Sequence, residues 1–85
     1  MNRQVRAVPA GATLRIQAAE PFILHWSRDE WSHVNDTRAA ATSVGISFTD
    51  IGIAADERAP IRFTFRWLDP ERWEGRDYIV EVRPG

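Results

Sequence analysis

Four tryptophans lie among the 85 residues, and the positions of two of them call for a functional explanation. Trp31 directly follows a charged turn, and Trp73 lies between charged neighbours in the segment 69–76. A tryptophan in such a place either covers the core or stands exposed as a flat platform. An exposed indole stacks on the apolar C–H face of a sugar while polar side chains bond the hydroxyls, a combination typical of ligand sites. We therefore take Trp31 and Trp73 as candidate carbohydrate-binding residues, with a lid over the core as the alternative.

Three polar residues near these tryptophans are candidate partners for sugar hydroxyls: His25, Arg72 and Glu74. The alternative interpretation is that His25, like His33, is an ordinary exposed surface residue. Two histidines without any cysteine and without a His-x-x-x-His spacing form no metal-binding pattern. We expect neither a metal nor a cofactor.

The carboxylates show no catalytic pattern. A glycosidase needs two of them at a defined separation in a cleft, and nothing singles out such a pair among the twelve acidic residues. No Gly-x-Ser-x-Gly motif marks a nucleophilic serine, and there is no cysteine. A chain of this length also builds only a thin core. The sequence therefore predicts no catalytic residues here and assigns any catalysis to a partner domain.

The charge balance and the hydropathy exclude further classes. Eleven basic residues, all arginine, face twelve acidic ones, and this balance argues against a nucleic-acid-binding protein. No apolar run approaches the length of about 20 residues that a membrane-spanning helix needs. The N-terminal residues lack the apolar centre of a signal peptide, which predicts a cytoplasmic location if the chain is a complete protein and leaves the location open otherwise.

Apolar and polar residues alternate with a period of two, which predicts strands rather than helices. The clearest strand is 61–68, where Ile61, Phe63, Phe65 and Trp67 share one face. The same pattern places Trp26 on an apolar face, so Trp26 and Trp67 are expected in the core. Further strands are predicted over residues 13–18, 21–26, 44–50 and 77–83.

Other segments show weaker sequence patterns. In 44–50 the apolar face is expected to carry Val44, Ile46 and Phe48, with Ile51 as a less simple alternative. A short strand is predicted at 31–34, one helical turn at 37–42 and a loop at 69–76.

Short strands separated by turns predict an all-β fold, an immunoglobulin-like antiparallel β-sandwich of about six to eight strands. We expect this single domain to span residues 11–85. Residues 1–10 are expected to be a flexible N-terminal segment or an edge strand.

Two strings carry a resemblance to a known family: Phe63-Thr64-Phe65-Arg66-Trp67 within the strand 61–68, and Arg72-Trp73-Glu74-Gly75-Arg76-Asp77-Tyr78. With the earlier His25-Trp26-Ser27 and Asp29-Glu30-Trp31, the chain resembles the C-terminal β-sandwich domain of bacterial glucoamylases and glucodextranases over roughly residues 11–83. It is more distantly similar to the starch-binding modules of bacterial amylases.

The resemblance implies a non-catalytic accessory domain that binds α-glucan or starch weakly and accompanies a catalytic glycosidase domain. By position, the glucan-stacking residues of such modules fall on His25, Trp31 and Trp73. The alternative is an interaction module that binds no sugar, in which Trp31 and Trp73 anchor a protein or domain interface.

Overall fold

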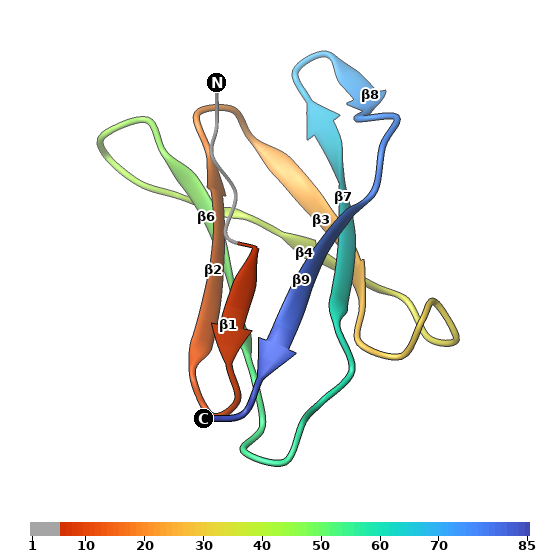
Figure 1. The fold of residues 1–85 in the computed structure, drawn as a ribbon. Helices are drawn as coiled ribbons and strands as arrows, with labels where there is room; N and C mark the ends of the chain where they lie inside the picture. Colours follow the sequence, from red (N-terminus) through yellow and green to blue (C-terminus); the bar gives the residue numbers. More distant parts are fainter. Residues whose placement is uncertain (1–5) are drawn as a thin grey trace.

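The computed structural model describes residues 6–85, which form nine strands in two sheets and contain no helix (Figure 1). No segment of this range is therefore a helix that could cross a membrane. The predicted all-β sandwich is confirmed, with nine strands instead of about six to eight. Residues 1–5 of the predicted N-terminal segment lie outside the described residues. The strands are β1 (Ala7–Pro9), β2 (Thr13–Ala18), β3 (Phe22–Ser27), β4 (Asn35–Arg38), β5 (Ala40–Ala41), β6 (Ser47–Gly52), β7 (Ile61–Leu68), β8 (Glu71–Trp73) and β9 (Tyr78–Arg83).

The two sheets have the order β1-β9-β7-β3-β4, with β8 paired to β7, and β2-β6-β5. They face each other across the core (Figure 1). The chain passes from one sheet to the other four times, between β1 and β2, β2 and β3, β4 and β5, and β6 and β7. All pairings are antiparallel except that of β1 with β9. The packing of β2, β6 and β5 against β3, β7 and β9 is the immunoglobulin-like arrangement.

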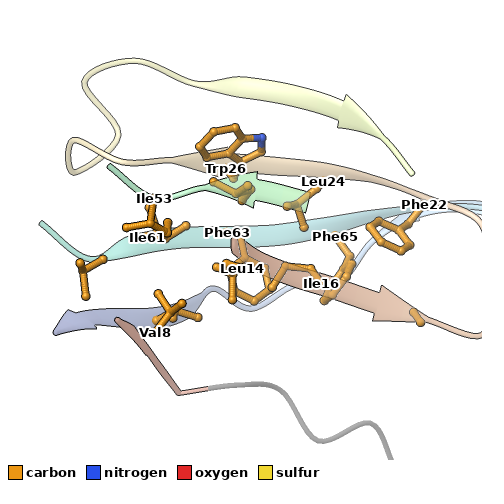
Figure 2. Close-up of a cluster of buried hydrophobic side chains, with 14 of the residues drawn as sticks. Val8, Leu14, Ile16, Phe22, Leu24, Trp26, Ile53, Ile61, Phe63 and Phe65 are labelled. Atoms are coloured by element: carbon orange, nitrogen blue, oxygen red, sulfur yellow. The ribbon is translucent and has the colours of Figure 1, made fainter. Parts of the chain in front are cut away.

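The core lies between the inner faces of the sheets, and the alternation of residues determines which side chains enter it (Figure 2). Phe65 is central: its ring packs edge-on against Phe22 at 5.1 Å and stacks on Trp67 at 4.7 Å between centroids. Trp67 is 8% exposed and Trp26 is 9% exposed, so both belong to the core as predicted. In a domain this small, each such side chain contributes a large share of the buried apolar area.

The predictions for residues 31–42 are wrong. Residues 31–34 form a turn and bends, and the segment predicted as a helical turn contains the strands β4 and β5. Pairing with neighbouring strands overrides the helical preference of the alanines, because β4 pairs with β3 at the edge of the larger sheet and Ala40 and Ala41 of β5 pair with β6. Thr37 adds a side-chain contact there, since its Oγ1 accepts a hydrogen bond of 3.0 Å from Nε1 of Trp26.

The apolar face of Val44, Ile46 and Phe48 predicted for residues 44–50 is also wrong, whereas the alternative residue, Ile51, is buried in the core. The strand β6 begins only at Ser47, and its buried residues are Ser47, Thr49 and Ile51. Val44 is 79% exposed in the turn that precedes it. Phe48 lies on the opposite face, where the guanidinium of Arg15 covers its ring at 4.2 Å. An arginine of the neighbouring strand thus shields an aromatic ring that the pattern places inside.

The segment 69–76, predicted as a loop, contains β8. This strand forms a hairpin with β7 in which Trp73 is opposite Arg66 and Arg72 is opposite Trp67. Since Arg66 lies on the outer face of β7, the hairpin places Trp73 on the outer face of the larger sheet.

Candidate functional site

His25 lies on the outer face of the larger sheet, because it alternates along β3 with the buried Leu24 and Trp26. Its cross-strand neighbours are Thr64 on β7 and Asp36 on β4. Nδ1 of His25 is 2.7 Å from Oδ1 of Asp36, and 29% of the His25 side chain is exposed. Because a carboxylate only accepts hydrogen bonds, Nδ1 carries the proton and the ring orientation is fixed.

Both candidate tryptophans contact this imidazole. The Trp31 ring stacks on it, with 5.6 Å between centroids and 24° between planes. The Trp73 ring approaches edge to face, at 5.2 Å and 81°. The angle between the planes of the Trp31 and Trp73 indoles is therefore at least as large as the gap between these two interplanar angles, which is more than half a right angle. They form an angled surface rather than one flat platform.

The turn that carries Trp31 is held by the side chain of Ser27, which is fully buried. Its Oγ accepts hydrogen bonds from the amides of Asp29 and Trp31, at 3.2 and 3.0 Å, and donates one of 2.7 Å to Oδ1 of Asp29. The carboxylate of Asp29 also accepts from the amide of His33 at 2.9 Å and lies 2.6 Å from its Nδ1. These hydrogen bonds, first that of the His33 amide and then that of Ser27, lower the pKa of Asp29 to about 2.

The backbone of the same turn is strained. Glu30 and Trp31 have φ angles of 58° and 68°, in the left-handed region that costs a non-glycine residue about 1–2 kcal/mol. The Ser27 and Asp29 network fixes one end of this strained pair. Oε2 of Glu30, 2.9 Å from Nε of Arg62, joins the turn to β7. Backbone strain that the surroundings enforce clusters at binding sites, and here it serves to lay Trp31 on His25.

A shallow pocket of about 310 Å³ continues the surface beside Trp73. Its walls are Thr64, Trp73, Gly75, Arg76 and Asp77. Trp73 is 53% exposed. Because Thr64 is the cross-strand neighbour of His25, the pocket adjoins the three contacting rings on the outer face of the larger sheet.

Arg72 and Glu74 are not brought to this surface. They alternate with Trp73 along the chain and turn toward the opposite side of the hairpin. The carboxylate of Glu74 accepts hydrogen bonds from Nε1 of Trp67, at 2.9 Å, and from the hydroxyl of Tyr78. The bond from Tyr78 is the main reason that the pKa of Glu74 is lowered. Nη2 of Arg72 is 3.2 Å from Oε1 of Glu20, and its guanidinium lies over Trp67.

The side chain of His33 is 87% exposed, and its Nδ1 lies beside the Asp29 carboxylate. Within residues 6–85, no group of three histidine, cysteine or acidic side chains could hold a metal ion.

The comparisons with known proteins point to glucan-active enzymes. Two curated proteins of Niallia circulans, both named cycloisomaltooligosaccharide glucanotransferase, are 27% and 31% identical to this chain. Each alignment covers 95% of the chain but only 10% of the relative, so the chain spans about a tenth of the length of the curated relatives it matches. No family model and no solved structure matches. The similarity therefore relates this chain to one domain-sized part of a glucanotransferase, and the narrower resemblance to glucoamylases stays a prediction.

The sequence did not point to Ser27, Asp36, Thr64, Arg76 or Asp77. A signal existed for Thr64, because it alternates with the apolar residues of 61–68 and so lies on the opposite face of the strand, where it is 8% exposed. Its partners across the sheet depend on strand register, which joins residues far apart in the chain.

Proposed function

We propose that this chain is a non-catalytic accessory domain of a glucan-active enzyme and that it binds an α-glucan weakly through Trp31, His25 and Trp73. The single observation that carries the proposal is the contact of one imidazole with both indoles. Three residues from β3, from the turn after it and from β8 converge there on the outer face of one sheet.

The chemistry of the surface suits a sugar chain. One face of Trp31 covers His25, and the indole is partly exposed, which suits stacking on a pyranose. His25 holds its Nδ1 proton toward Asp36, and its Nε2 makes no hydrogen bond to another residue within 6–85. Nε2 is therefore available to a sugar hydroxyl between the two indoles.

The angle between the indoles favours a curved glucan. Two coplanar rings would suit a straight, ribbon-like chain such as a β-1,4-glucan. Rings inclined by more than half a right angle suit an α-glucan, whose successive residues turn. The name of the relatives adds support, since isomalto-oligosaccharides are α-linked glucose oligomers.

The proposed accessory role rests on the small share of each relative's length that the alignment covers. A part that spans about a tenth of a glucanotransferase leaves room for catalysis in the rest of such a protein. The domain would then hold the glucan near a catalytic partner and raise its local concentration.

Titration of the chain with maltoheptaose or an isomalto-oligosaccharide, followed by amide chemical shifts, tests the proposal. We expect shifts centred on Trp31, His25 and Trp73 at millimolar sugar, and their loss in Trp73→Ala. Val44→Ala is the matched control, because it also removes exposed apolar surface but lies on a distant turn. Unchanged spectra at millimolar concentrations of both sugars would refute the proposal and favour the interaction module.

A further inference from the structure

The strand register shows where the outer surface continues beyond the three contacting rings. The turn that carries Trp31 follows Ser27 and occupies the surface at that end of β3. Trp73 stands on the β8 side of His25. Toward the other end of β3 the next outward residue is Ile23, which is partly exposed and lies about 7 Å along the strand. A glucan held by the rings can therefore continue over Ile23.

Arg38 borders Ile23 on the side of β4. The two residues are directly opposite each other, so both side chains leave the sheet on its outer face. Arg38 is also a diagonal neighbour of His25, at a separation of about 7–8 Å that a long side chain bridges. Arg38 is exposed, and its guanidinium has no hydrogen bond or ion pair with another residue in 6–85. An apolar side chain and a set of free N–H donors thus lie side by side.

The other charged residues opposite or diagonal to His25 have partners. These pairs are Asp36 with the imidazole itself, Arg62 with Glu30, and Arg66 with Glu71. The guanidinium of Arg66 also lies 6.0 Å from the centroid of the Trp73 ring, on the side of β8. Within residues 6–85, Arg38 is therefore the charged neighbour of His25 whose donors are left for a ligand. Its charge is balanced by the nearby Asp36, so the surface suits a neutral ligand better than an anion.

We infer that Ile23 and Arg38 form a second glucan subsite, which takes the glucosyl residue next to the one held by Trp31, His25 and Trp73. The apolar face of this sugar covers Ile23, and the guanidinium donates hydrogen bonds to its hydroxyl oxygens. The subsite rests on the proposed function and extends it, because two neighbouring residues of one glucan are then bound together. The surface recognises an oligosaccharide rather than a single sugar.

Arg38→Gln tests the subsite by titration with maltoheptaose and with isomaltoheptaose, followed by amide chemical shifts. The shorter glutamine removes the guanidinium donors and keeps an exposed polar side chain. We expect the affinity to fall by about tenfold, as for the loss of one hydrogen bond to a charged group. Arg83→Gln is the matched control and should bind as the wild type does. Arg83 is also exposed and without a side-chain partner in 6–85, but it lies at the end of β9 far from β8.

Two further readouts separate binding from folding. The amides of Ile23 and Arg38 should shift with a heptaose that the wild-type chain binds. Urea denaturation of Arg38→Gln should match that of the wild type, because the side chain is exposed. Equal affinities of the wild type and Arg38→Gln, or equal losses in Arg38→Gln and Arg83→Gln, would overturn the inference while the proposed function stands. If neither heptaose binds the wild-type chain, the proposed function fails and the subsite fails with it.

Discussion

The imidazole of His25 and the indole of Trp31 stack at 5.6 Å although the backbone between them bends through two consecutive left-handed residues. The stacking energy of one aromatic pair, about 0.5–1.5 kcal/mol, does not by itself offset the strain of Glu30 and Trp31. The hydrogen bonds of Ser27 and Asp29 supply the remainder. The position of Trp31 therefore depends on polar groups at the start of the turn more than on the ring contact itself.

Ser27→Ala tests this dependence. The change removes an acceptor for two amides and a donor to Asp29 at a fully buried position, so we expect a loss of about 1–3 kcal/mol in the free energy of unfolding. Glucan affinity should fall as well, because Trp31 loses its fixed position. Urea denaturation and sugar titration measure the two effects. Ser43→Ala, in an exposed turn, should leave both unchanged, and equal results for the two variants would contradict the role of Ser27.

The pH dependence of the turn follows from Asp29. Its pKa is lowered from 3.8 to about 2, chiefly by the His33 amide. Because the folded pKa lies below the unfolded one, the ionised carboxylate stabilises the turn above pH about 4, and this contribution is lost as the pH falls toward 2. A carboxyl-carbon NMR titration should show a midpoint near 2 for Asp29. A midpoint near 3.8 for Asp29 would show that the network is not formed in solution.

Much of the fold follows from local patterns. The stripe of Ile61, Phe63, Phe65 and Trp67 predicts the bounds and the buried face of β7, because one side chain in two must enter a core. The same rule fails at Phe48, where Arg15 from a neighbouring strand covers the ring. Such cover depends on strand pairing, and no local pattern contains it.

The candidate site, like the fold, is predictable from the sequence only where it depends on local patterns. The separation of Trp31 and Trp73 from the apolar stripes is visible in the sequence, since neither belongs to a long alternating run. Their meeting at His25 depends on the register of β3, β7 and β8. The left-handed residues Glu30 and Trp31 are neither glycine nor asparagine, so their residue types do not predict this turn. The hydrogen bonds of the turn form only once Ser27 is buried.

Phe65→Ala probes the core that supports the site. Phe65 is 2% exposed and contacts the rings of Phe22, Phe63, Trp67 and Tyr78. We expect a destabilisation of about 3–5 kcal/mol, because a large cavity remains beside rings that cannot collapse into it. Thermal and urea unfolding measure the loss. Val44→Ala should change the stability by less than about 0.5 kcal/mol. A similarly small effect of Phe65→Ala would contradict the packing described for the core.

Glu74→Gln tests whether the two sides of the β7–β8 hairpin have separate roles, one in stability and the other in glucan binding. Trp67 and Tyr78 both donate to the Glu74 carboxylate, and an amide accepts through only one of its two terminal atoms. We expect a loss of about 1–2 kcal/mol in the free energy of unfolding, while glucan affinity stays unchanged because Trp73 faces the other way. Arg72→Ala should likewise leave the affinity unchanged, since Arg72 lies over Trp67 on the same side as Glu74. Urea denaturation and sugar titration of both variants, with Trp73→Ala as the positive reference, provide the measurement. If either variant lost glucan binding with its fold intact, the surface would have to include the residues on that side, as the sequence pattern alone suggests.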